Sequence, residues 1–138
     1  MTVKERNQEL RMVIELVRVH LPKTLNDSDL CKDICAVVAV NLRRIASDGE
    51  KSAEAWDKRA YHTKADELRR EMGWALPAAQ IAESLAYVPR KFTRADWERL
   101  QGLTPEDVEL GVRPRFKDIE VLRGAAAAAR QTLLKKRE

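Results

Sequence analysis

The fold is decided by residues 34–40, Ile-Cys-Ala-Val-Val-Ala-Val, which would leave a helix with no polar face. A helix that is apolar on all sides is usually the central element of a bundle. The valines alone would suit a strand, but the wider segment is too long for one, and its alanine and leucine content favours a helix. We therefore expect a buried helix over residues 29–47, followed by a turn at Asp48-Gly49.

Amphipathic segments surround this helix in the sequence. Apolar residues recur at three- and four-residue steps from Leu10 to Leu21, so a helix is expected over residues 3–21, with Pro22 as its stop. Caps and periodicity predict further helices over residues 52–73, 77–88, 93–101, 104–110 and 115–136. No alternating strand pattern is present. The chain is therefore predicted to be all-α: one domain, residues 1–138, forming a single bundle of about five main helices with one or two short ones.

Three local features refine the expected bundle. In the helix over residues 52–73, Trp56 and Leu68 belong to the apolar stripe and are expected to face inward. Thr93 and Asp96 have the spacing of a capping box at the start of the next short helix. The five alanines of residues 125–129 allow close approach of a neighbouring helix, either in this domain's own core or from a partner chain.

The composition is that of a soluble, highly charged protein, with 44% apolar and 35% charged residues. No apolar run approaches the roughly 20 residues of a membrane span, and the first residues lack the apolar core of a secretory signal. A cytoplasmic location without a membrane partner is expected. Cys31 and Cys35, four residues apart on a helix, are interpreted as two small buried apolar side chains. The only histidines, His20 and His62, lack metal-ligand spacing to them, so neither a metal site nor another cofactor is predicted.

The positive charge of the chain is local. Residues 90–138 contain twelve Lys/Arg and eight Asp/Glu, whereas residues 1–89 contain fourteen of each, so the net charge of +4 comes from the last third. Much of it lies in two similar segments, PRKFTR at residues 89–94 and RPRFK at residues 113–117. Cations beside an aromatic ring suit nucleic acid, because Lys and Arg neutralise phosphate and a ring offers a stacking face.

These two segments provide the leading candidates for phosphate contacts: Arg90, Lys91, Arg94, Arg113, Arg115 and Lys117. Phe92 and Phe116 are candidates for base or sugar contacts. The alternative for both rings is a hydrophobic staple that locks the start of a helix, with solvated basic neighbours. The hypothesis depends on one condition, which is that the basic residues after residue 89 converge on a single exposed surface.

A second group of basic candidates lies on the helix predicted over residues 52–73: Lys58, Arg59, Lys64, Arg69 and Arg70. Acidic residues at helical spacing surround them, so the alternative is a set of ion pairs that supports the helix. Lys135, Lys136 and Arg137 form a further cluster, which would also complement the dipole at a helix C-terminus.

Catalytic and sequence-reading motifs are missing. The chain contains no GxGxxG, P-loop or HExxH motif, and its two histidines lie in different predicted helices without a nucleophile motif. We therefore expect a protein that is not an enzyme. No helix-turn-helix, zinc-finger or RRM pattern is evident, so binding is expected to be dominated by the nucleic-acid backbone, sensitive to salt and tolerant of sequence.

Residues 55–70, AWDKRAYHTKADELRR, resemble the helical C-terminal regions of large subunits in type I CRISPR surveillance complexes. The chain's size, predicted helicity and basic surface also resemble the separate small subunits of such complexes. The resemblance implies a non-catalytic helical subunit that steadies the guide–target duplex or the displaced single strand through Lys and Arg. It also implies contact with other subunits, including further copies of the same chain.

Two alternatives remain open. A helical protein–protein adaptor or inhibitor, of phage or regulatory type, would dock on a partner with Trp97 and Tyr87 as anchors and would not bind nucleic acid. A small helical enzyme or metal protein would instead gather His62 and carboxylates in a pocket. Binding of single-stranded or duplex nucleic acid at low salt separates the first hypothesis from the adaptor.

Overall fold

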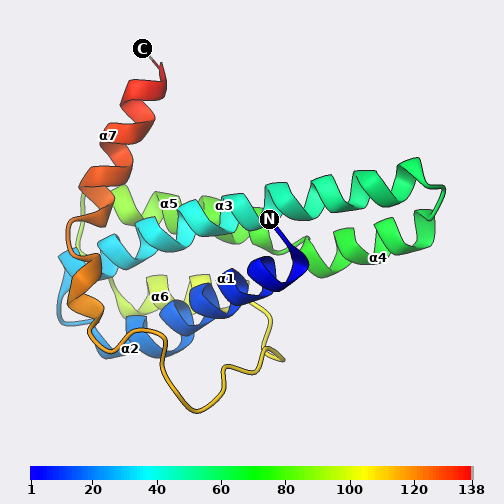
Figure 1. Cartoon of the computed structure of the whole chain (residues 1–138). Coiled ribbons are helices and arrows are strands. Elements are labelled where there is room, and N and C mark those ends of the chain that lie inside the picture. Colours follow the sequence, from blue (N-terminus) through cyan, green and yellow to red (C-terminus); the bar gives the residue numbers. More distant parts are fainter. Residues whose placement is uncertain (138) are drawn as a thin grey trace.

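The computed structural model describes residues 1–137, with side chains through residue 131, and every regular element in that range is helical (Figure 1). In chain order the elements are α1 (Val3–Glu15), the π-helical turn η1 (Leu16–His20), α2 (Leu21–Lys23), α3 (Ser28–Lys58), α4 (His62–Met72), α5 (Ala75–Tyr87), α6 (Arg94–Gln101), the 3-10 turn η2 (Ile119–Leu122) and α7 (Ala125–Arg137). The predicted all-α bundle is confirmed. Leu133 and the terminal cluster of Lys135, Lys136 and Arg137 lie beyond the side chains that are described.

The first half of α3 is the centre of the bundle, as its apolar sequence predicted. Ile34, Val38 and Leu42 are fully buried, and α3 packs against α1, α4, α5 and α7. Val40 is the exception, because 47% of it is exposed on the side that the other helices leave open. Cys31 and Cys35 are both buried and unbridged, which confirms their interpretation as small core residues.

The predicted turn at Asp48-Gly49 is wrong, because α3 continues through it to Lys58. Asp48 accepts a hydrogen bond from Arg6 of α1 at 3.0 Å, which supports the helix at this point. Gly49 is buried, and a Cβ added there would lie 3.2 Å from Cγ of Met72 in α4. The glycine thus lets α4 approach α3 closely, and it ends no helix.

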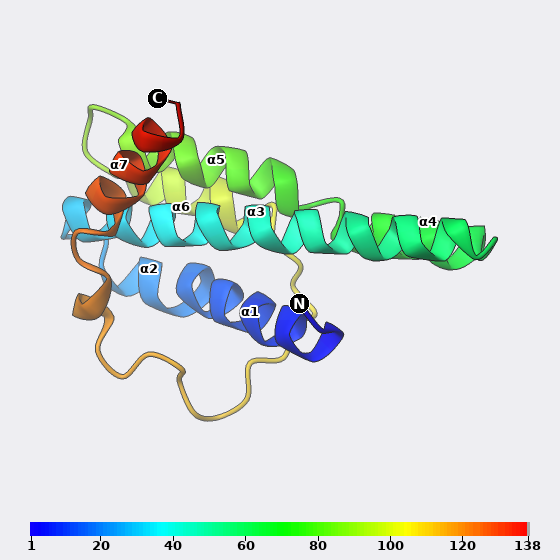
Figure 2. The ribbon, with the colours of Figure 1, turned by 45° about the horizontal axis from the view of Figure 1, so that its top comes forward.

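The helix predicted over residues 52–73 is divided between α3 and α4 by a tight turn at residues 59–61. The C-terminal half of α3 and the antiparallel α4 form a helical hairpin that projects from one end of the bundle in both views (Figures 1 and 2). Ala53 and Ala65 are fully buried where the two helices meet. Small residues at Gly49, Ala53 and Ala65 therefore make the hairpin a closely packed stalk.

The first helix also differs from its expected form. Pro22 does not stop it but lies inside the short α2, and the regular α-helix gives way to a π-turn after Glu15. The indole Nε1 of Trp97 in α6 donates a hydrogen bond to the carbonyl of Val17 at 2.8 Å. This contact joins α6 to the π-turn, where the backbone departs from the regular i to i−4 pattern.

Residues 103–118 contain no helix, so the short helix expected from Thr104 is absent. The guanidinium of Arg18 donates instead to the carbonyls of Val108 (2.7 Å), Pro105 (3.3 Å) and Glu106 (3.4 Å), and so satisfies carbonyls of this irregular segment. The segment runs along α1 and α2 as an irregular strap (Figure 1).

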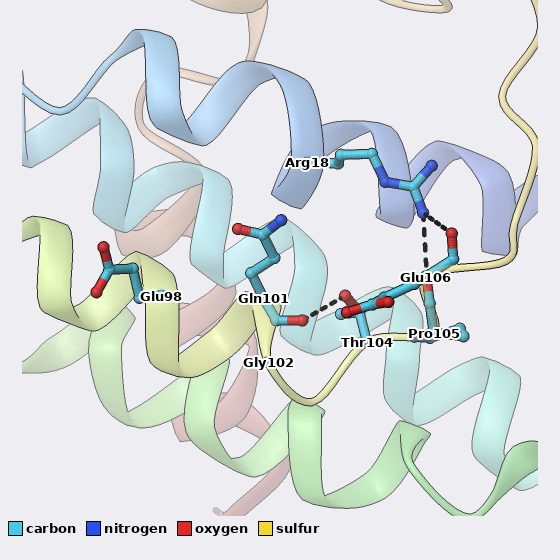
Figure 3. A pocket seen from close by; sticks show the side chains of 7 residues that line it. All are labelled: Arg18, Glu98, Gln101, Gly102, Thr104, Pro105 and Glu106. Carbon is cyan, nitrogen blue, oxygen red and sulfur yellow. Dashed lines mark hydrogen bonds between the residues drawn. The ribbon is translucent and has the colours of Figure 1, made fainter.

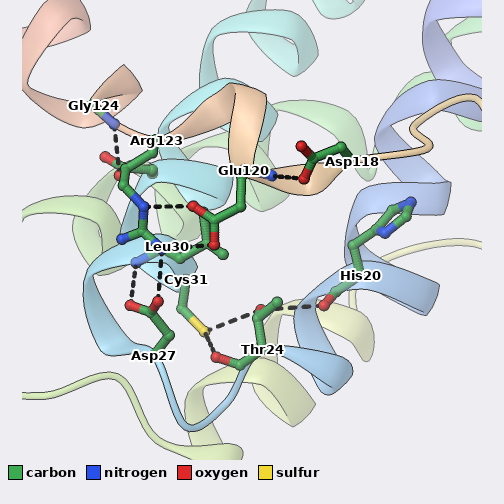
Figure 4. A network of polar contacts seen from close by, with 10 residues as sticks. His20, Thr24, Asp27, Leu30, Cys31, Asp118, Glu120, Arg123 and Gly124 are labelled. Atoms are coloured by element: carbon green, nitrogen blue, oxygen red, sulfur yellow. Dashed lines mark hydrogen bonds and ion pairs between the residues drawn. The ribbon is translucent and has the colours of Figure 1, made fainter.

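Buried or half-buried carboxylates attach the last elements to the start of α3 (Figure 4). Asp33 accepts the backbone N–H groups of Gly124 (2.8 Å) and Ala126 (3.0 Å), and thereby satisfies the N-terminus of α7. Arg123 joins Asp27 to Glu120, with closest contacts of 2.7 Å to each. The last helix therefore begins at Ala125 rather than at residue 115, after Gly124 has turned the chain with φ = 91°. The first turn of α7 packs on α3, as the interpretation of the alanines as a packing site within this domain expected.

Val38→Ala and Val40→Ala form a matched pair that tests the central role of α3. Val38→Ala removes fully buried methyl groups, so it should lower the free energy of unfolding by about 2 kcal/mol. Val40→Ala, on the same helix but 47% exposed, should have little effect or a slightly stabilising one. Urea denaturation followed by circular dichroism measures both. Equal effects at the two positions would contradict the assignment of the core.

Candidate nucleic-acid interface

Arg90 is engaged within the molecule. Its guanidinium donates to both oxygens of Asp96 at 2.6 and 2.7 Å, a bidentate ion pair next to the confirmed capping box of Thr93 and Asp96. The hydrogen bonds from the Arg90 guanidinium lower the pKa of Asp96 to about 2. Burial of the carboxylate acts in the opposite direction, and the hydrogen bonds from Thr93 lower the pKa further. The charge of Arg90 is therefore already balanced within the molecule, which weakens its attraction to a phosphate.

The neighbours of Arg90 have mixed surroundings. Phe92 is only 4% exposed, so the prediction that its ring contacts a base or sugar is wrong; the ring packs in the core, as the staple interpretation required. Arg94 lies 3.4 Å from Glu98 and over the ring of Trp97. Lys91 is exposed at an open cavity of about 500 Å³, which Asp27 and Asp29 also line.

In the second basic segment, Arg115 is anchored by the buried Glu15. Both carboxylate oxygens lie 3.0 Å from the Arg115 backbone N–H, and the Phe116 N–H and His20 also bond to Glu15. Burial alone would raise the pKa of Glu15, but these hydrogen bonds outweigh it and lower that pKa. Phe116 is half-buried and packs edge-on against His20, so less of its ring is open to a ligand than the sequence hypothesis expected. Arg113 and Lys117 remain exposed on the strap.

The predicted residues therefore do not converge on one surface. The segment at residues 89–94 lies at the start of α3, because the Phe92 N–H donates to the Ser28 hydroxyl at 2.8 Å. The second group of basic candidates, which includes Lys58 and Arg59, lies at the far end of α3, whose 31 residues span about 45 Å. Arg113 and Lys117 belong to the strap beside α1 and α2 (Figure 1). Arg90 and Arg115 are each paired with a buried carboxylate, so the two segments after residue 89 do not present a continuous surface of unpaired cations.

Basic and aromatic side chains lie together at the tip of the α3–α4 hairpin. We define the tip cluster as Trp56, Lys58, Arg59, Tyr61 and Lys64. The rings of Trp56 and Tyr61 meet edge to face, 5.7 Å apart. The Lys64 ammonium lies 4.6 Å from the centroid of Trp56 and 5.7 Å from that of Tyr61, and the Arg59 guanidinium lies 5.8 Å from that of Trp56. Cations are thus held over aromatic rings at the end of a projecting stalk.

One acidic neighbour of the tip cluster, Asp57, already has partners. Asp57 pairs with Nδ1 of His62 at 2.8 Å and with Arg69 at 2.8 Å, and these two hydrogen bonds lower the pKa of Asp57. Arg69 also binds Glu50, so it fastens α4 to α3, as the ion-pair alternative expected. Arg70 donates to the backbone carbonyl of Asp66. Within residues 1–131, Lys58, Arg59 and Lys64 have no carboxylate within ion-pair distance.

The turn at the tip is strained. Ala60 has φ = 64°, the left-handed region that favours glycine, and it is the one non-glycine residue of the described chain in that region. The N–H of Tyr61 donates to the carbonyl of Trp56 at 2.9 Å, which closes the end of α3. A left-handed alanine costs stability, and such strain is common at functional sites.

Trp56 and Tyr61 were missed as site residues by sequence reasoning. Trp56 was expected to face inward, yet it is only half-buried, and 54% of Tyr61 is exposed. The signal that could have revealed them is a cluster of aromatic and basic residues in residues 56–64. It was hidden because the turn contains neither glycine nor proline.

Other parts of the surface are less suited to an anion. The cavity of about 460 Å³ between η1, α6 and the strap is lined by Arg18, Glu98 and Glu106 (Figure 3). Its one guanidinium already donates to carbonyls, and its two carboxylates would repel phosphate. Burial raises the pKa of the Cys31 and Cys35 thiols, which keeps both protonated and unreactive.

Two whole-molecule observations bear on other functions. No group of three or more His, Cys, Asp or Glu side chains comes together as a metal-ion site in the part of the chain that the structure describes. None of the described helices has the length and apolar character needed to cross a bilayer.

In comparisons with known proteins, no family model matches the chain, and no curated protein or solved structure is significantly similar to it.

Asp96→Asn should weaken the protein in a pH-dependent way. Because the pKa of Asp96 is lowered in the folded state to about 2, its contribution is present above pH ~4 and is lost as the pH falls towards 2. The variant should lose about 1–2 kcal/mol of unfolding free energy at neutral pH, and this deficit should shrink between about pH 4 and pH 2. Urea titrations at several pH values measure it. Glu98→Gln, at an exposed ion pair, is the control and should show no comparable pH dependence.

Ala60→Gly should stabilise the hairpin, because glycine adopts the left-handed conformation without a steric penalty. We expect a gain of about 0.5–1 kcal/mol in the free energy of unfolding. Ala55→Gly, at an exposed helical position of the same hairpin, should instead cost about 1 kcal/mol. Thermal and urea denaturation compare the two. A loss of stability in Ala60→Gly would mean that the turn is not strained.

Proposed function

We propose that this chain is a non-catalytic helical protein that binds the sugar-phosphate backbone of nucleic acid through the tip cluster. The observation that carries the proposal is the group of three exposed cations, Lys58, Arg59 and Lys64, which have no carboxylate partner among residues 1–131. Two of them, Arg59 and Lys64, lie against aromatic rings. Lysine and arginine bind phosphate by charge without reading the base sequence.

The architecture of the hairpin supports this function. A stalk fastened by Arg69 and by close packing at Gly49 carries the tip cluster away from the bundle. A projecting tip can enter a groove or follow a strand that the broad side of the bundle could not reach. Exposed Lys91, Arg113 and Lys117 would add weaker, longer-range attraction.

The proposal extends to an assembly. Residues 55–70, which resemble part of the large subunit of type I CRISPR surveillance complexes, make up the end of α3, the tip and most of α4. The segment that carries the resemblance is thus the same segment that forms the proposed binding site. We therefore propose a helical subunit of a nucleoprotein complex, which binds the nucleic-acid backbone through this hairpin and packs against other subunits.

Trp97 and Tyr87, the two residues expected to anchor a protein partner, give the adaptor alternative little support. The Trp97 indole donates to Val17, and the Tyr87 hydroxyl donates to the carbonyl of Ala126 at 2.8 Å. Both side chains are half-buried and hold this bundle together. Neither is presented to a partner in the way an interface anchor requires.

The test is binding of fluorescein-labelled single-stranded and duplex oligonucleotides, followed by fluorescence anisotropy between about 50 and 200 mM salt. Wild-type protein should bind at low salt, with affinity falling steeply as salt rises. The triple variant Lys58→Ala, Arg59→Ala, Lys64→Ala should bind more weakly. Its plot of log affinity against log salt for a single strand should be shallower by about 2 units, because about 0.7 is lost per phosphate contact.

A matched control removes the same charge elsewhere. Arg11, Lys23 and Arg99 are exposed and lie outside the tip cluster. Their triple alanine variant should keep most of the affinity and of the salt slope. Equal losses in the two triple variants would mean that binding depends on net charge alone. No binding to either oligonucleotide at low salt would refute the function and favour a protein partner.

A further inference from the structure

We propose that the ligand of the tip cluster is single-stranded nucleic acid, with one unpaired base stacked on the ring of Tyr61. This inference rests on the proposed function and specifies its ligand class. It is carried by the exposure and support of that ring, by the cations beside it and by the chemistry of bases.

The Tyr61 ring is both exposed and held in place. It is 54% exposed, yet the edge-to-face contact with Trp56 and the bond from its N–H to the Trp56 carbonyl fix its position relative to α3. Its hydroxyl has no hydrogen-bond partner within residues 1–131, so no polar anchor accounts for its placement. A ring held in this way can accept a flat partner with little further loss of conformational entropy.

The nearby cations are placed for the phosphates of a stacked nucleotide. Lys64 is shared between the two rings, at 4.6 Å from the centroid of Trp56 and 5.7 Å from that of Tyr61. Arg59 adjoins Trp56 on the same turn, and Lys58 ends α3. A base on Tyr61 would therefore bring its own phosphates close to Lys64, with Arg59 beside the adjoining Trp56 ring.

The exposed ring favours nucleic acid over an acidic peptide. Both ligands would satisfy the cations, but carboxylate side chains offer no flat surface to cover Tyr61. A base does, and stacking of a base on an aromatic side chain is strong and tolerant of sequence, because every base has a π-face. The same argument separates a single strand from a duplex. In a duplex the neighbouring base pairs already cover both faces of each base, so Tyr61 could reach only a base at the end.

The experiment compares two strands of equal charge. One is an oligothymidine of about 12 nucleotides, and the other is an abasic sugar-phosphate strand of the same length, each labelled with fluorescein and titrated by anisotropy at low salt. Wild-type protein should bind the oligothymidine roughly tenfold more tightly. Tyr61→Ala should abolish that preference by weakening oligothymidine binding alone. Tyr61→Phe, which keeps the ring, should retain the preference.

Controls separate stacking from a general loss of surface. Leu76→Ala removes an exposed apolar side chain outside the tip cluster and should leave the preference unchanged. Tyr61→Ala should change the affinity for a duplex closed at each end by a non-nucleotide linker by less than about twofold, because such a duplex has neither unpaired bases nor an open terminal base face. Circular dichroism of each variant checks that the bundle remains folded.

The outcomes distinguish this inference from the function on which it rests. If both strands bind equally and the tip cations still matter, stacking is refuted and backbone binding stands. If the preference survives Tyr61→Ala, the bases contact another residue; stacking on Tyr61 is then refuted, and backbone binding stands. If neither strand binds, both proposals fail. A polyglutamate peptide of equal charge that displaces the oligothymidine as well as unlabelled oligothymidine does would assign the tip to an acidic protein partner and overturn the inference.

Discussion

A helix with apolar side chains on nearly every side is stable in water only where other elements cover it, and this constraint shapes the molecule. In α3 it applies to the first half, around Ile34 and Val38, where α1, α5 and α7 provide the cover. The second half of the same helix has a polar outer face, and it packs on α4 with only the start of α1 as a further neighbour near Asp48. One continuous helix is therefore both the core of the bundle and one side of a projecting stalk.

Buried carboxylates determine how the rest of the chain is attached. Glu15 holds the strap, Asp33 holds the start of α7, and Asp96 holds the link before α6. Each is buried, and each is satisfied by backbone N–H groups or a guanidinium, because an unpaired charge in that setting would be costly. Much of the basic excess after residue 89 is thus part of the internal structure and not of an open anionic-ligand surface.

The tip cluster shows the opposite arrangement. Arg59 and Lys64 contact rings and leave their charges exposed, and the acid beside them, Asp57, is paired with Arg69 and hydrogen-bonded to His62. The left-handed Ala60 sets the turn that brings Tyr61 back towards Trp56. Because the stalk is closely packed, it holds this strained and exposed end in place.

Sequence periodicity alone determined that the chain is all-helical, that residues 34–40 are central, and that Thr93 and Asp96 cap α6, because these features depend on neighbours within a few residues. It did not determine where α3 ends. In the sequence Gly49 resembles a turn residue, and only its contact with Met72 shows that it is a packing residue. Ala60 gives no local signal of a left-handed turn. Only the tertiary structure decided which cations are exposed. Arg115 is bound by a carboxylate 100 residues away, a pairing that spacing cannot reveal, whereas Lys64 meets two rings that the turn brings together.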